Sequence, residues 1–158
     1  DYRGTFNSRS QDIAEEMNMF DVLLQPSQTE GFGLTPIEAM SCGIPAIVND
    51  TTAMPEMVIP GKTGEICKTD RRRYTPDATW IWTADVQDLY ECMERLYSKL
   101  HQANTVAKDC RDHVLNKYDI NKHFTEKWVP LMEQLQKDLL PPLTIPKKEN
   151  IIQTPSTS

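Results

Sequence analysis

The sequence predicts an α/β fold with a Rossmann-like parallel sheet flanked by helices. Two short apolar runs that do not alternate with polar residues, 21–25 and 45–49, are separated by a segment long enough for one helix. Strands that are apolar on both faces are typical of parallel sheets covered by helices. A third short strand is expected at 65–67, and amphipathic helical patterns fill much of the chain after residue 85. This order of elements indicates βαβ units.

The first half of the chain supplies the predicted sheet. A helix precedes the first strand, because three apolar residues recur at helical spacing: Ile13, Met17 and Phe20. A second helix is expected over about 37–42, after the first strand, with Gly43 at its C-terminal cap. A short helix within 54–59 and a turn at 60–64 then lead into the third strand.

The second half is expected to be helical after one irregular segment. Residues 68–82 hold three consecutive arginines, two tryptophans and a proline, and they look like an insertion in a loop. Three amphipathic helices follow, the second with Asn104 as its N-cap and the third kinked by Pro130. Residues 141–158 are rich in Pro, Lys, Ser and Thr and are predicted to form a flexible tail.

Composition narrows the class of protein. The 158 residues suit one domain, and the formal charge of −6 argues against nucleic-acid or anionic-membrane partners. There is neither an apolar run of membrane-spanning length nor a leader-like segment, so we expect a cytoplasmic protein without a membrane span. The four cysteines form no Cys-x-x-Cys pair and are expected to be reduced thiols. The three histidines complete no ligand set, so no metal is expected.

The loop after the first strand holds the residues with the clearest chemistry. Glu30 comes just beyond a strand's carboxyl end, where open parallel sheets bind ligands. Gly31 and Gly33 let the backbone approach a ligand closely. The amides of Gly33, Leu34 and Thr35 precede or open a helix and form a natural site for an anion or a hydroxyl group.

A second acid, Glu38, has two local interpretations. Thr35-Pro36-Ile37-Glu38 is a capping-box sequence, in which Glu38 accepts a hydrogen bond from the Thr35 amide. Pro36 suits the first helical position. On local grounds capping is favoured over ligand binding for Glu38, whereas Glu30 has no helix to cap and either a ligand role or a structural role is open to it.

The whole string resembles a known family. Glu30 and Glu38 have seven residues between them within EGFGLTPIEAMSCGIP, and this resembles the E-x7-E signature of family 4 glycosyltransferases of the GT-B fold. The strand-like DVLLQPS before it, and PAIV, PEMV and GKTG after it, are similar to the family in the same order. The resemblance is clear over about residues 13–67 and looser in the later helices.

The resemblance implies a retaining transferase that uses a nucleotide-sugar donor and requires no metal or other cofactor. Glu30 would contact hydroxyls of the donor sugar and act in catalysis, and Glu38 would hold the ribose hydroxyls. The amides around Phe32, Gly33, Leu34 and Thr35 would meet the sugar and the diphosphate. This favours a ribose role for Glu38, which is compatible with its place at a helix start.

The chain also departs from the family. The full GT-B fold has two Rossmann-like domains, and residues 1–140 are similar to the later part of the C-terminal, donor-binding one. We therefore expect this domain to be incomplete at its N-terminus, its partner to be a missing N-terminal acceptor domain, and the fragment alone to be inactive. The family's basic pair for the donor phosphates has no counterpart before Glu30, where only Arg3 and Arg9 are basic. Two alternatives stay open: another GT-B activity, or a non-catalytic nucleotide-sugar-binding or interaction module.

Four further features have weaker functional interpretations. Arg71-Arg72-Arg73 could bind a phosphate or a partner, but a solvated loop is favoured. Trp80 and Trp82 could stack on a sugar, but packing within the insertion is favoured. Residues 61–64 are interpreted as a turn rather than a phosphate loop. Asn49-Asp50-Thr51 matches a glycosylation acceptor, but the resemblance makes it a loop near the donor site.

Overall fold

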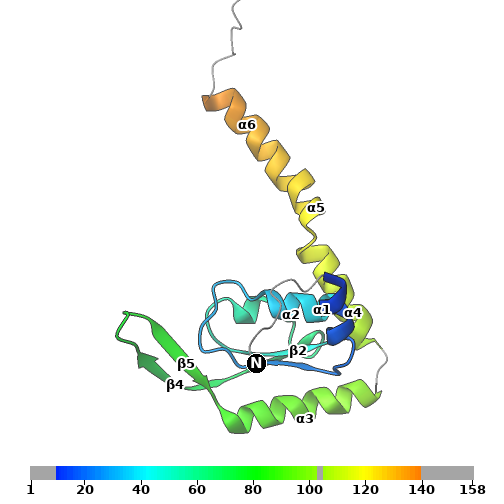
Figure 1. Ribbon diagram of the computed structural model, residues 1–158, viewed down its shortest axis with the longest axis vertical. Helices are drawn as coiled ribbons and strands as arrows, with labels where there is room; N and C mark the ends of the chain where they lie inside the picture. Colours follow the sequence, from blue (N-terminus) through cyan, green and yellow to red (C-terminus); the bar gives the residue numbers. More distant parts are fainter. Residues whose placement is uncertain (1–9, 103–104, 140–158) are drawn as a thin grey trace, which may run out of the picture. The chain divides into compact units, whose positions relative to one another are not determined.

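The computed structural model describes residues 10–102 and 105–139. The chain divides into two compact units, residues 1–119 and residues 120–158, and each is described by itself. The first unit holds a parallel sheet with helices on both faces and a separate two-stranded hairpin (Figure 1). The predicted α/β class with a parallel sheet is confirmed.

Three parallel strands form the sheet in the order of the sequence. They are β1 (Leu23–Gln25), β2 (Ala46–Asn49) and β3 (Gly64–Cys67). Leu24 is opposite Ile47, and Val48 is opposite Ile66. All four residues of β2 are buried, which is the pattern of a central strand covered on both faces. The two apolar runs and the short segment predicted at 65–67 therefore form the sheet that the sequence predicts.

Helices cover the two faces of the sheet. The bounds are α1 (Ser10–Met17), α2 (Leu34–Ser41), the 3₁₀ helix η1 (Met54–Glu56), α3 (Val86–Gln102) and α4 (Val106–Lys117). Ala46 and Val48 of β2 belong to the apolar cluster that includes residues of α2 and α4, whereas Ile47 between them packs with residues of α3. The alternation follows from the period of two along a strand. Consecutive residues of one strand thus join two separate halves of the core.

The predicted ends of helices α2 and α4 are confirmed only in part. Gly43 has a left-handed φ of +86° just beyond α2, and its amide donates to the carbonyl of Met40, so its predicted role at the C-terminal end is confirmed. The helix itself begins at Leu34, three residues earlier than predicted. The N-cap of α4 is Thr105, one residue later than the predicted Asn104, which lies outside the described residues.

The segment 68–82 is not an irregular loop, and this prediction is wrong. Two antiparallel strands, β4 (Thr69–Tyr74) and β5 (Trp80–Ala84), form a hairpin with a register shift near its base. The arginines are solvated as expected, but they lie on a strand. No buried face imposes an alternating pattern on this strand, so its residues carried no strand signal.

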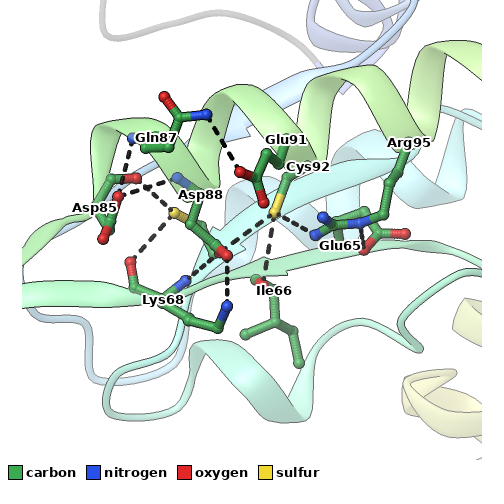
Figure 2. Close-up of polar contacts among 10 residues, drawn as sticks. Glu65, Ile66, Lys68, Asp85, Gln87, Asp88, Glu91, Cys92 and Arg95 are labelled. Atoms are coloured by element: carbon green, nitrogen blue, oxygen red, sulfur yellow. Dashed lines mark hydrogen bonds and ion pairs between the residues drawn. The ribbon is translucent and has the colours of Figure 1, made fainter.

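A polar cluster joins α3 to β3, as Figure 2 shows. Asp85 caps α3 by accepting from the amides of Gln87 and Asp88. The Asp88 carboxylate is buried and accepts from the backbone amide and the Nζ of Lys68, both at 2.8 Å. The hydrogen bonds from Lys68 lower the pKa of Asp88. These bonds fix the start of the helix against the end of the strand.

Three of the four cysteines belong to the apolar clusters of the first unit. All four are free thiols; Cys67, Cys92 and Cys110 are buried, and Cys42 is half-buried. Burial raises the pKa of Cys92 to about 11 and that of Cys110 to about 12. Within residues 10–102 and 105–139, no three His, Cys, Asp or Glu side chains gather in a way that could hold a metal ion.

The second unit is helical over its described residues, 120–139. A turn of α-helix, α5 (Ile120–His123), continues into a π-helical turn, η2 (Phe124–Trp128), and then into α6 (Val129–Leu139). The π turn ends two residues before Pro130, whose ring and missing amide disrupt the normal ladder of helical hydrogen bonds. The predicted interruption at Pro130 is thus a widened turn, and the predicted tail at 141–158 lies outside the described residues. None of the helices in the described ranges is long and apolar enough to span a bilayer.

Candidate functional site

Glu30 is held at the carboxyl end of β1 by its own loop. Its Oε1 atom accepts hydrogen bonds from Gln25 Nε2 at 3.2 Å and from Ser27 Oγ at 3.1 Å. Its backbone amide donates to Thr52 Oγ1 at 3.1 Å, which ties the loop to the segment after β2. Both side-chain bonds that it makes to described residues fall on one oxygen, so Oε2 is available to a ligand.

Residues at the end of β2 and just after it support this loop. Asn49 Nδ2 donates to the Ser27 carbonyl at 3.0 Å, and Asn49 is fully buried. Asn49 Oδ1 and Thr51 Oγ1 are buried and accept no hydrogen bond from the described part of the chain. Buried polar atoms without partners are rare and usually have a functional or structural reason. Here they lie at the strand end that faces the Glu30 loop.

Thr52 adds backbone strain at the same place. Its φ is +49°, a conformation that β-branched residues adopt only exceptionally. Its hydroxyl oxygen is the acceptor of the Glu30 amide, so the strained residue also makes the link between the two loops. Strained backbone concentrates at functional sites.

The N-terminus of α2 follows directly. Gly33 is the N-cap with φ +89° and ψ +75°, and a Cβ at this position would lie 2.2 Å from Met54 Cε. Glycine is therefore required both by conformation and by space. The amides of Leu34 and Thr35 open the helix and have no carbonyl one turn earlier to bond. They form the anion-binding end that the sequence predicts for this loop.

The capping-box prediction is wrong. α2 begins at Leu34 with Gly33 as its N-cap and no side-chain cap bond, so Thr35 lies inside the helix. Pro36 is consequently the third helical residue rather than the first, still within the turn where no amide is needed. The left-handed glycine takes the capping position, which leaves the side chain of Glu38 without a capping role.

Glu38 lies apart from the Glu30 network. It is half-buried and lines a hollow of about 230 Å³ together with Ile13 and Ala14 of α1, and Ser41 and Cys42 at the end of α2. Its carboxylate makes no hydrogen bond to the described residues, and the structure records no contact between it and Glu30. The two acids of the motif therefore occupy separate positions, Glu30 in the loop after β1 and Glu38 on α2.

The other predicted site residues differ in exposure. Phe32 and Leu34 are exposed, by 51% and 65%, and Thr35 is half-buried. The Phe32 ring packs edge-on against Tyr118 at 6.2 Å between centroids. The exposed side chains of Phe32 and Leu34 are apolar and offer no hydrogen-bonding group. The backbone amides are therefore the groups that this segment can offer to a ligand.

Sequence reasoning missed the supporting residues Gln25, Ser27 and Thr52, and it placed Asn49 near the donor site only through the resemblance. Their signal was the presence of polar side chains directly at and after two strand ends, which parallel strands bring to one edge. Together these groups can orient a carboxylate beside helix-start amides. Such an arrangement suits a ligand that offers both hydroxyl donors and an anionic group.

Comparison with known proteins shows that part of this chain is similar to a known family. Residues 4–73 match the family model of group 1 glycosyl transferases. The N-acetyl-alpha-D-glucosaminyl L-malate synthase of Bacillus anthracis is 38% identical over 66 residues, 42% of this chain and 17% of that protein. The lipopolysaccharide core mannosyltransferase LpsB of Rhizobium meliloti is 36% identical over 75 residues, 46% of this chain and 21% of that protein.

Solved structures agree on the fold. Sucrose-phosphate synthase from Thermosynechococcus elongatus matches with a TM-score of 0.57 and 26% identity over 78% of this chain. HepE from Anabaena, solved in complex with UDP and glucose, matches with a TM-score of 0.55 and 20% identity over 81% of this chain. The aligned part is 26% and 29% of those chains, and about a fifth of the two curated relatives. Residues 4–73 are therefore similar to the group 1 glycosyltransferases, and the first unit has the α/β fold found in GT-B glycosyltransferases.

Proposed function

We propose that this chain is the donor-binding part of a family 4 glycosyltransferase, which transfers a sugar from a nucleotide-sugar to an acceptor with retention of configuration. The observation that carries the proposal is Glu30, whose carboxylate is held on one oxygen by Gln25 and Ser27 in the loop that leads into α2. A carboxylate held in this way, followed by helix-start amides, suits a ligand that carries hydroxyl groups next to a diphosphate.

Glu30 binds the donor sugar in this proposal. Two hydroxyls of a hexose are two hydrogen-bond donors, and a carboxylate accepts both with charge-assisted strength. The Gln25 and Ser27 bonds fix Oε1, so the approach of Oε2 to the sugar costs little side-chain entropy. A fixed carboxylate near the transferred sugar also stabilises positive charge that develops on the ring, which is its catalytic role.

Glu38 and the helix-start amides hold the nucleotide. The carboxylate of Glu38 lies in a hollow and makes no bond to the described residues, so it is free to accept from the vicinal hydroxyls of a ribose. The amides of Gly33, Leu34 and Thr35 donate to the diphosphate, and the α2 dipole adds to their attraction. These donors stabilise the leaving diphosphate as its charge grows during transfer.

The remaining assignments follow the same chemistry. The helix-start amides carry out the charge stabilisation that a metal would otherwise provide, so the reaction requires no metal or cofactor. The acceptor binds mainly to an N-terminal domain, which is the partner of this one. Retention follows from attack on the face of the leaving diphosphate, which itself helps to deprotonate the acceptor. Nucleic acid is no partner of a chain with a formal charge of −6.

Calorimetric titration of the 158-residue chain tests the proposal. UDP-, GDP- and ADP-linked glucose and mannose are titrated separately, and we expect saturable binding of one base class without added metal. Binding by none of them contradicts the donor site. The same donor is then supplied to the chain joined to an N-terminal GT-B domain, and the anomeric configuration of the product is read by NMR. Donor binding with no transfer in that protein supports a non-catalytic nucleotide-sugar-binding module instead.

A further inference from the structure

The β4–β5 hairpin has one face of distinctive composition. The strand register places Arg72 opposite Trp82 and Tyr74 opposite Trp80, so these four side chains share a face, which we call the hairpin face. The Arg72 guanidinium lies 4.9 Å from the centroid of the Trp80 ring. The Tyr74 and Trp80 rings are 5.0 Å apart. The hairpin face is thus an assembled cluster of aromatic rings and one cation.

These aromatic side chains remain open to solvent. Tyr74 is 56% exposed and Trp80 is 44% exposed, and neither belongs to a core cluster of the first unit. The predicted packing within the insertion is confirmed for Trp80, which contacts Tyr74, yet Trp80 stays largely exposed. Aromatic rings arranged in this way bind the apolar faces of sugar rings.

Charge on the hairpin differs from charge on the rest of the chain. Residues 69–84 hold three arginines and two aspartates, a net charge of +1 in a chain of formal charge −6. Arg71 is paired with Asp70 at 3.2 Å, whereas Arg72 makes no ion pair with a described residue. A guanidinium stacked on an aromatic ring keeps its N–H edge free for a carboxylate or a phosphate.

The hairpin begins beside the proposed donor site. The backbone amide of Trp82 donates to the carbonyl of Gln28 at 3.1 Å, and Gln28 lies in the loop that carries Glu30. Figure 1 shows the hairpin projecting from the first unit at the edge where that loop lies. A molecule bound to the hairpin face therefore lies close to the loop that would hold the donor sugar.

We propose that the hairpin face binds an anionic sugar, a hexose that carries a phosphate or a carboxylate, as part of the acceptor; this rests on the proposed glycosyltransferase function. Arg72 binds the anionic group, and Trp80 with Tyr74 packs against the sugar ring. A membrane surface fits less well. The tip at 75–79 is polar, contains Asp77 and is closed by bonds between Thr75 and Thr79, so it lacks an apolar end to insert.

Titration of the intact chain with mannose 6-phosphate, followed by tryptophan fluorescence, tests this inference. We expect a saturable change that neither mannose nor inorganic phosphate alone produces at the same concentration. Arg72→Met keeps the stem on Trp80 and removes the charge, and should weaken binding by about tenfold or more. Trp80→Leu, measured by calorimetry because it removes a reporting tryptophan, should weaken binding to a similar degree.

Arg71→Met is the matched control, because it makes the same change in charge on the other face of the same strand. It should leave the affinity for mannose 6-phosphate within about twofold, since an exposed charge pair contributes little. No saturable binding, equal loss in Arg71→Met and Arg72→Met, or binding only to vesicles of phosphatidylserine and phosphatidylcholine would each overturn the proposal. Calorimetry with UDP-glucose on the same variants reports on the donor site separately, so failure of one site does not imply failure of the other.

Discussion

The two glutamates of the E-x7-E string lie in contrasting surroundings. Glu30 is held by neighbouring side chains, two bonds to one carboxylate oxygen and one from its amide to Thr52. Glu38 lines a small hollow between α1 and α2 without any hydrogen bond from its carboxylate to the described residues. A held carboxylate suits the reacting sugar, whose position decides the rate, and a freer one suits a binding contact that adjusts to its ligand. The contrast predicts different effects of mutations around each acid.

The largest effect is expected at the glycine between the two acids. Gly33→Ala puts a Cβ 2.2 Å from Met54 Cε and requires a left-handed alanine at φ +89°. We expect this variant to lose saturable donor binding in calorimetry and to be destabilised by about 1–3 kcal/mol in denaturant unfolding. Gly31→Ala is the matched control, because its Cβ would meet nothing within 4 Å. Equal losses in the two variants would show that the conformation of Gly33 does not matter.

A smaller effect is expected from the support of Glu30. Ser27→Ala removes one of the two bonds to Oε1 and leaves the other, from Gln25. We expect affinity for the donor sugar-nucleotide to fall about threefold to tenfold, because one such bond contributes about 0.5–1.5 kcal/mol. Affinity for the free nucleotide should not change. The exposed Ser98 on α3 serves as a control, and a Ser27→Ala protein with full donor affinity would mean that Glu30 needs no support.

Cys42 reports on the hollow around Glu38. It is the half-buried thiol and lines that hollow, while the other three cysteines are buried. With a disulfide reagent at pH 8 we expect one fast-reacting thiol, absent in Cys42→Ser, because burial and the raised pKa values of Cys92 and Cys110, about 11 and about 12, slow the others. Free nucleotide should slow the fast phase severalfold. An unchanged rate at saturating nucleotide would place the ribose elsewhere.

The smallest effect on binding is expected far from both acids. Asp88→Asn removes the charge that accepts two hydrogen bonds from Lys68, and should cost about 1–2 kcal/mol of unfolding free energy without changing donor affinity. The pKa of Asp88 is lowered on folding from its ordinary value of 3.8. Its contribution is therefore present above that pH and is lost as pH falls through the folded pKa.

Urea titrations across pH check this prediction. The stability difference between the parent and Asp88→Asn should hold from neutral pH to about pH 5 and shrink below 3.8, the unperturbed value. Asp112→Asn, which breaks the exposed pair with Lys108, is the control and should have little effect at any pH. A difference that grows on acidification would contradict the assignment of Asp88.

The sheet could be predicted from the sequence because buried strands consist mostly of apolar residues. The first two strands lie in runs of mostly apolar residues, and Gly43 follows α2 with a left-handed φ of +86°. The hairpin at 69–84 escaped prediction for the opposite reason. Both of its strands are largely exposed, so no alternation marks Arg71 to Tyr74 as a strand, although Trp80-Ile81-Trp82-Thr83 has residues of high β propensity.

The site could be predicted in outline but not in its contacts. The resemblance singled out Glu30 and Glu38, while their different surroundings depend on residues distant in sequence, such as Thr52 for one and Ile13 for the other. The capping-box prediction failed because Thr35 and Glu38 keep the same spacing when both lie inside the helix. Gly33 is the N-cap, with a left-handed backbone conformation and no side-chain cap bond. The spacing of side chains in the sequence does not reveal such a cap.

The most direct test of the account compares two ligands in two variants. UDP and UDP-glucose, or the pair of the base class found to bind, are titrated into the parent chain, Glu30→Gln and Glu38→Gln. Loss of the carboxylate charge should weaken a ligand that it binds by about tenfold. We expect Glu30→Gln to weaken only the sugar-nucleotide and Glu38→Gln to weaken both ligands equally. Loss of free-nucleotide affinity in Glu30→Gln, or unchanged affinity for both ligands in Glu38→Gln, would contradict the division of roles between the two acids.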